Sequence, residues 1–127
     1  MVRYRSEQIN RVLRTMHKAM DDIEASVVVN IDGLLVEAFP TGEGAASSDQ
    51  VAALTATLIG LAEKTLSRLA QGDVQRLLLE GEDGVMVVYP SGKRAALAVL
   101  IKKEAKLGMA MYAVKRAAEE VAGVLGD

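Results

Sequence analysis

The stretch VVVNIDGLLVEAF, residues 27–39, restricts the fold more than any other segment of this chain. Two runs rich in β-branched and apolar residues flank the pair Asp32-Gly33. Such a pair is a strong β-hairpin signal, because a type I′ turn needs positive φ at both central residues. We therefore predict strands over residues 25–31 and 34–39. We interpret Asp32 as the corner of a hairpin rather than as a catalytic carboxylate.

Three further strands are predicted at residues 74–80, 85–89 and 93–101, and the tight turns between them predict antiparallel neighbours. Runs such as LLL and AALAVLI do not alternate between polar and apolar residues. Strands of this kind are buried on both sides, so we expect helices on both faces of the sheet. The alanines within residues 95–98 would let one of these helices approach closely.

Three helices are predicted from apolar residues that recur at three- and four-residue spacing. The first covers residues 6–22 with Ser6 as its N-cap, and the second covers residues 49–70 with Ser48 as its N-cap. The third begins at Leu107 and runs for about 18 residues. The predicted fold class is therefore α+β, with the element order α-β-β-α-β-β-β-α.

The predicted middle helix carries two apolar stripes on a helical wheel. The first, which we call the leucine stripe, contains Val51, Leu54, Leu58, Leu61, Thr65 and Leu69. The second, the alanine stripe, contains Ala52, Ala56, Ile59, Glu63, Leu66 and Ala70. A surface helix of a monomer needs only one apolar stripe, so we assign the flat alanine stripe to an oligomer interface and leave the leucine stripe for the core. The alternative is a helix buried more deeply within one subunit.

Composition excludes several classes of function. With no cysteine there is neither a disulfide framework nor thiolate chemistry, and a net charge of −2 gives no electrostatic footprint for nucleic acid. No apolar run reaches the roughly 20 residues of a membrane span, and the N-terminus lacks an apolar signal segment. We expect no membrane insertion and a cytoplasmic protein. The 127 residues suffice for one core, so we expect a single domain over residues 1–127.

No group of residues makes a credible active site. The single histidine, His17, lies at the edge of the first helix's apolar stripe and has no second histidine or cysteine with which to hold zinc. The loop before the middle helix lacks the P-loop lysine and carries Glu43 and Asp49, which would repel phosphate. We therefore expect no catalytic residue, no metal and no cofactor, and a protein that is not an enzyme.

The order of these motifs resembles the Roadblock/dynein light-chain family, which includes the bacterial MglB-like proteins. The resemblance covers residues 6 to 125 and rests on VVVNIDGLLVEAF, the long alanine-rich helix, EGEDGVMVVYP and LAVLIKKEAKLGMAMYAVKRAAEEV. Its most specific pieces are Asp32-Gly33, Gly84 before a strand, and Leu107-Gly108 at the start of the last helix. It implies a Roadblock/profilin-like fold, in which a five-stranded antiparallel sheet carries the middle helix on one face and the two terminal helices on the other.

The resemblance also implies a homodimer, in which the middle helices pack together and the third strands pair to join two sheets into one. Pairing of the third strands would remove an exposed strand edge. The residues expected at this interface are Ala52, Ala56, Ile59, Glu63, Leu66, Ala70, Val74, Arg76 and Leu78.

Members of the family bind and regulate small Ras-like GTPases or act as platforms in larger complexes, so the resemblance implies such a partner here. We expect Lys64 and Arg68 to contact the GTPase. Arg68 or Arg76 could supply an arginine in trans to the transition state of GTP hydrolysis, although MglB-like proteins are thought to act by remodelling their GTPase. One alternative is a dimerisation or scaffold module with no effect on hydrolysis. The other is a small-molecule sensor, which the shortage of aromatic and convergent polar residues disfavours.

Overall fold

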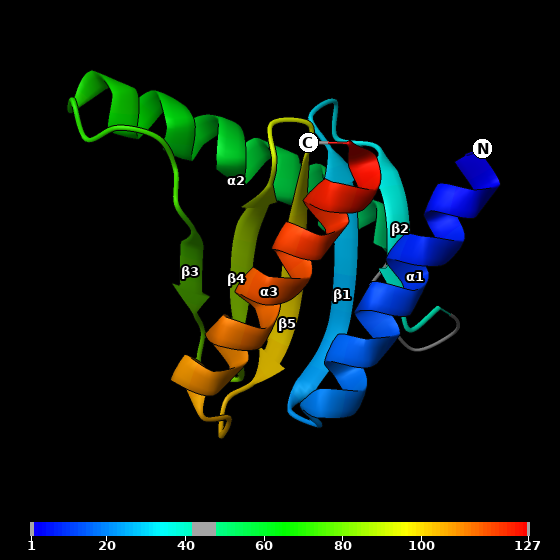
Figure 1. Ribbon diagram of the computed structural model, residues 1–127. Helices are drawn as coiled ribbons and strands as arrows, with labels where there is room; N and C mark the ends of the chain where they lie inside the picture. Colours follow the sequence, from blue (N-terminus) through cyan, green and yellow to red (C-terminus); the bar gives the residue numbers. More distant parts are fainter. Residues whose placement is uncertain (1, 42–47, 127) are drawn as a thin grey trace.

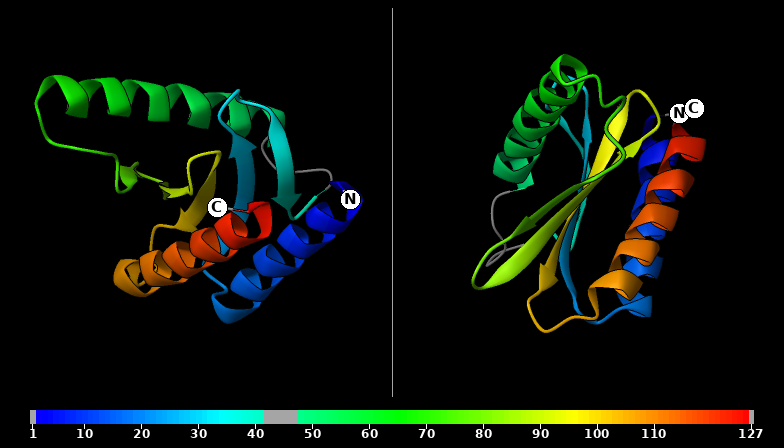
Figure 2. Two further views of the ribbon diagram at one scale, coloured as in Figure 1. Left: turned by 45° about the horizontal axis from the view of Figure 1, so that its top comes forward. Right: turned by 90° about the vertical axis from the view of Figure 1, so that its left-hand side faces the viewer.

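The computed structural model describes residues 2–41 and 48–126, and the predicted order of elements is confirmed (Figure 1). The elements are α1 (Val2–Ala19), β1 (Ile23–Asn30), β2 (Leu35–Phe39), α2 (Ser48–Arg68), β3 (Leu77–Glu80), β4 (Gly84–Ser91), β5 (Ala95–Lys102) and α3 (Leu107–Leu125). The strands form one antiparallel sheet in the order β2-β1-β5-β4-β3. As expected, α2 covers one face of the sheet, and α1 and α3 cover the other (Figure 2).

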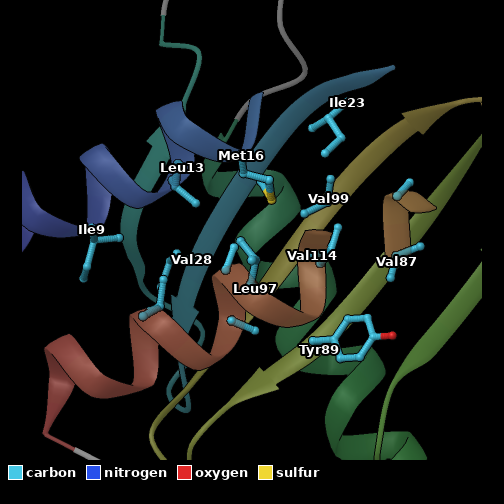
Figure 3. Close-up of a cluster of buried hydrophobic side chains, with 14 of the residues drawn as sticks. Ile9, Leu13, Met16, Ile23, Val28, Val87, Tyr89, Leu97, Val99 and Val114 are labelled. Atoms are coloured by element: carbon cyan, nitrogen blue, oxygen red, sulfur yellow. The ribbon is translucent and has the colours of Figure 1, made fainter. Parts of the chain in front are cut away.

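The larger core lies between the sheet and the pair α1 and α3 (Figure 3). Leu13 of α1 and Val114 of α3 are fully buried there against Val28 and Leu97 of the two central strands. Each such side chain stabilises the fold by about 1.5–3 kcal/mol relative to its exposed state. The central strands are thus buried on both faces, which explains why their sequences do not alternate between polar and apolar residues.

The β1–β2 hairpin confirms Asp32 as a turn residue, but the predicted type I′ turn is wrong. Within residues 30–35 only Gly33 has a positive φ, of 85°. The Gly33 N–H donates to the Asn30 carbonyl at 3.0 Å, and the Asn30 N–H donates to the Leu34 carbonyl at 3.0 Å. This is a three-residue loop closed by a glycine bulge. The Asn30 side chain stabilises it, because Oδ1 accepts the N–H groups of Asp32 and Leu34.

β3 begins at Leu77, three residues later than predicted, so Val74 and Arg76 lie in the connection from α2 rather than in a strand. Leu77 lies opposite Val88 of β4. Two residues before Leu77, an extended strand would face Pro90, which has no N–H to donate to a ladder. The ladder therefore ends at Leu77, and β3 is short.

α1 is tied to the sheet by a polar contact near each end. The helix begins at Val2, so Ser6 lies inside it and is not its N-cap; the Ser6 hydroxyl donates instead to Glu37 Oε2 at 2.6 Å. Near the C-terminus of α1, His17 Nε2 lies 2.9 Å from Ser26 Oγ, and the His17 ring meets Phe39 edge-on at a centroid distance of 4.7 Å. His17 is thus a helix-flank residue that contacts the sheet.

Partial burial of the His17 ring lowers its pKa below the ordinary 6.5, and a backbone hydrogen bond to Ile23 offsets part of this effect. Because the folded protein then binds a proton less readily than the unfolded chain, the contribution of His17 to stability is complete above pH 6.5 and is lost as the pH falls below it. We predict that the unfolding free energy of the wild type decreases more between pH 7 and about pH 5.5 than that of His17→Gln. Urea unfolding at the two pH values measures the difference, and equal decreases would contradict the prediction.

Candidate functional site

α2 lies across the sheet, and only its first half is seated on it. Ala52 and Thr55 are the fully buried residues of α2, and both belong to that half. The C-terminal half of α2 continues past the β3 edge of the sheet (Figures 1 and 2). This second half therefore has little of its own chain beneath it.

The alanine stripe, and not the leucine stripe, is the face of α2 that packs on this chain's own sheet. Ala52 is fully buried and Ile59 partly buried in a cluster with Ala96 and Ala98 of β5. The expected close approach of a helix to the alanines of β5 is confirmed, because small side chains on both surfaces let helix and sheet come together. The assignment of the leucine stripe to the core is wrong, and Ala52 has its contacts within the chain.

The leucine stripe is consequently on the outside. Leu54, Leu61 and Leu69 are 54, 63 and 64% exposed, although a leucine gains about 1.5–3 kcal/mol when it is fully buried. Single exposed leucines are common on soluble proteins, but several along one flank of α2 and at the turn that follows it form an apolar surface. Such a surface indicates contact with another molecule.

The sheet face beside the leucine stripe is also open. Leu79, Met86 and Leu100 lie opposite one another on three neighbouring strands, and each keeps part of its surface exposed. Val51 of α2 and Leu100 line the same small cavity, so the flank of the helix and this sheet face adjoin. We call this combined surface the open corner; it consists of Leu54, Leu58, Leu61, Leu79, Met86 and Leu100.

β3 is an outer strand, and its outer edge faces no strand among the described residues. Leu78 and Leu79 on this strand are 41 and 39% exposed. An unpaired edge with exposed leucines is a template for another strand, and pairing would satisfy its backbone groups. The edge of β3 adjoins the open corner through Leu79, which belongs to both.

The other residues expected at the interface lie around the second half of α2. Glu63 and Val74 line a cleft of about 640 Å³. The cleft lies between α2, the connection after it, and the turns that join β1 to β2 and β4 to β5. Leu66 is partly buried, and Arg76 is exposed beside β3. Ala70 lies beyond the end of α2 with a φ of 55°, in the left-handed conformation that often ends a helix.

Lys64 and Arg68, the residues expected to contact a GTPase, are exposed on the second half of α2. Lys64 follows Leu61 by three residues and Arg68 follows Lys64 by four, so both lie beside the leucine stripe. Glu43, which was expected to repel phosphate, lies outside the described residues. Within residues 2–41 and 48–126, no group of three or more acidic and histidine side chains is placed to hold a metal ion. None of the helices in those ranges is long and apolar enough to cross a membrane.

Sequence reasoning missed two polar side chains, one beneath α2 and one on β2 at the opposite edge of the sheet. Thr55 was in neither stripe, yet it is fully buried under α2, and its hydroxyl has no hydrogen-bond partner among the described residues. Glu37 was given no role as a lone acid in a strand, yet it accepts hydrogen bonds from Ser6 and from the Ala38 N–H. A helical wheel drawn at all positions could have found Thr55. No local pattern could have found the contact between Ser6 and Glu37, which are 31 residues apart.

A sequence model described as the Roadblock/LC7 domain matches residues 13–101 of this chain. An uncharacterized protein of Methanocaldococcus jannaschii is 32% identical over 114 residues, covering 89% of this chain and 96% of that protein. Both are matches of amino-acid sequence, and each covers most of the chain.

Three solved structures show the same fold. MglB in a tetrameric arrangement gives a TM-score of 0.87 at 20% identity and covers 94% of this chain and 89% of that one. The gliding protein MglB from Thermus thermophilus gives 0.85 at 20% identity and covers 94% of this chain and 90% of that one. LokiProfilin2, in its complex with rabbit actin, gives 0.66 at 16% identity and covers 93% of this chain and 98% of that one. The Roadblock/profilin-like fold expected from the sequence is confirmed.

Replacing Leu61 with arginine tests the open corner as a self-association surface. We predict that Leu61→Arg is folded but monomeric, because burial of an unpaired charge at a contact costs on the order of several kcal/mol. Light scattering after size exclusion gives the mass, and circular dichroism checks the fold. Met109→Arg is the matched control, since Met109 is a similarly exposed apolar residue on α3, on the other face of the sheet. A Leu61→Arg variant with the same mass as the wild type, when that mass is a dimer's, would contradict the assignment.

Proposed function

The chain belongs to the Roadblock/LC7 family, and from this premise we propose that it is a homodimeric, non-enzymatic module that binds and regulates a small Ras-like GTPase. The family fold is a regulatory or adaptor one, and no catalytic family is indicated. We further propose that residues 1–127 form a single domain and act in the cytoplasm. The observation that carries the proposal is the open corner together with the outer edge of β3, which pairs with no strand in the described part of the chain.

A second copy of the chain fits both features at once. In a two-fold arrangement the β3 edges pair, and the half of α2 that projects past β3 lies over the open sheet face of the partner. The leucine stripes of the two α2 helices then meet, so that Leu54 and Leu61 are removed from water in both copies. The tetrameric arrangement of one MglB relative supports self-association within this fold.

Dimer formation would also present one continuous surface to a further partner. The two copies of Lys64 and Arg68 would flank the joined α2 helices, giving a basic rim around an apolar seam. Basic side chains at a rim steer an acidic partner and raise the rate of association more than the affinity. The likeness of this chain to MglB-like proteins supports a small GTPase as that partner.

Two modes of regulation make different demands on Arg68 and Arg76. An arginine that enters the GTPase site from another protein increases turnover by about 10³–10⁵-fold, and its replacement by alanine loses most of that factor. We propose remodelling instead, in which the dimer binds the GTPase around its switch loops and the hydrolysis machinery stays within the GTPase. Under remodelling, each alanine variant changes maximal turnover by less than about tenfold, because no guanidinium touches the transition state.

A pull-down from the native cytosol, loaded with either a GTP analogue or GDP, is the first test of the function. We predict enrichment of a Ras-sized GTPase in the analogue sample only, and a change in its single-turnover GTP hydrolysis when the purified protein is added. Lys64→Glu with Arg68→Glu should weaken binding by about tenfold or more, since each reversal replaces attraction by repulsion. Lys115→Glu on α3 is the matched control, because Lys115 is exposed on the opposite face.

The rival functions predict other outcomes. Binding that is indifferent to the nucleotide, with unchanged hydrolysis, would favour the scaffold module. The sensor would use the cleft lined by Glu63 and Val74, and a metabolite that binds there would raise the melting temperature of the protein alone. Recovery of no GTPase under either nucleotide would refute the proposed partner while leaving the dimer to be judged by its mass.

A further inference from the structure

Among the described residues the sheet has two outer strands, β2 and β3, at its opposite edges. This inference rests on the proposed dimer, in which two copies meet through the edges of β3. If both edges could pair, a two-fold contact at each would join copies into an open chain rather than a closed dimer. What closes β2 therefore decides how far self-association proceeds.

The hydrogen bonds of the β1–β2 hairpin show which backbone N–H and carbonyl groups of β2 point away from the sheet. The Asn30 N–H donates across the hairpin to the Leu34 carbonyl, so Asn30 points its backbone groups toward β2. Since residues of an antiparallel strand alternate in direction, Val28 and Ser26 point the same way and face Glu37 and Phe39. Between these two partners, Ala38 turns its N–H and carbonyl away from β1.

A new strand at this edge would need the outward donors of β2, and three features remove them. The register shifts between Val28 and Val29, so Val36 lies in a bulge that interrupts the regular spacing of the edge. β2 ends at Phe39, and the residue that follows it, Pro40, has no N–H to donate. The Ala38 N–H itself donates to Glu37 Oε1 at 3.1 Å, so it already has an acceptor.

α1 holds this carboxylate in place. The Ser6 hydroxyl donates to Glu37 Oε2 at 2.6 Å, which leaves Oε1 to accept the Ala38 N–H. Charge-assisted hydrogen bonds of this kind are about twice as strong as neutral ones. An incoming strand would have to displace Oε1 and would bring its own carbonyl close to a carboxylate. β3 has no bulge in its pairing with β4 and no proline.

We propose that Glu37, positioned by Ser6, closes the β2 edge against strand addition and thereby limits this chain to a closed dimer formed through β3. Glu37 and Ser6 thereby determine which of the two outer strands pairs with a second copy. The β2 edge is closed by the oxygen of Glu37 that accepts the Ala38 N–H, and a side chain without such an acceptor would not close it.

The pair Glu37→Ala and Glu37→Gln separates the acceptor from the rest of the side chain. Glu37→Gln keeps an oxygen for the Ala38 N–H and should retain the wild-type mass at every concentration. Glu37→Ala frees the Ala38 N–H, and light scattering should show a mass at least twice that of the wild type as concentration rises. Amide exchange at low concentration gives a second readout: the Ala38 N–H should exchange about tenfold or more faster in Glu37→Ala than in the wild type.

The same variants in a Leu61→Arg background distinguish this inference from the proposed dimer. If the double variant Glu37→Ala with Leu61→Arg associates while Leu61→Arg alone is monomeric, β2 pairs with β2 of another copy once the Glu37 side chain is removed. This outcome supports the inference whether or not β3 also pairs. If Glu37→Ala is folded by circular dichroism and keeps the wild-type mass in both backgrounds, the inference is wrong. Unchanged exchange of the Ala38 N–H in Glu37→Ala would overturn it independently, because Glu37 would then not be the acceptor that matters.

Discussion

The contact of the alanine stripe of α2 with β1 and with the alanines of β5 is the interaction on which the rest of the structure depends. Small side chains on both surfaces bring the helix close to the sheet, and the bulkier leucine stripe is turned outward as a result. The same contact holds only the first half of α2, so the second half projects past β3. Packing within one chain therefore produces the surface through which we propose that two chains meet.

The magnitudes show why that surface needs more than leucines. Three leucines from each copy, each 54–64% exposed in the single chain, together contribute roughly 5–11 kcal/mol when they are buried. Association costs about 4–15 kcal/mol in lost translational and rotational freedom. The leucine stripe alone would give a weak contact. The open sheet face and the backbone groups of β3 add to it, and they are available because β3 is short, exposed and unpaired within the described part of the chain. We propose that the β2 edge is closed, so that pairing with a second copy takes place at the β3 edge.

Much of the fold could be predicted because the local signals agree with the global arrangement. Strands without alternation indicated helices on both faces, and the hairpin at Asp32-Gly33 and the alanines of β5 were recognised from their residues. Strand ends were less accurate, since the start of β3 depends on Pro90 of the neighbouring strand. The direction of the two α2 stripes was reversed. A helical wheel shows that two apolar faces exist, but which one faces the chain's own sheet depends on the shape of the surface beneath it, and no local pattern contains that shape.

Amide hydrogen exchange of residues 54–69 and 77–80 at several protein concentrations would test the central claim most directly. If two copies meet through the leucine stripe and β3, the amides of β3 become protected as concentration rises through the dissociation constant, and the second half of α2 becomes protected with them. Protection in residues 107–125 should not change, because α3 lies on the other face of the sheet. Exchange in β3 and α2 that is the same at every concentration, in a protein whose mass has doubled, would show that the copies meet elsewhere and would contradict this account.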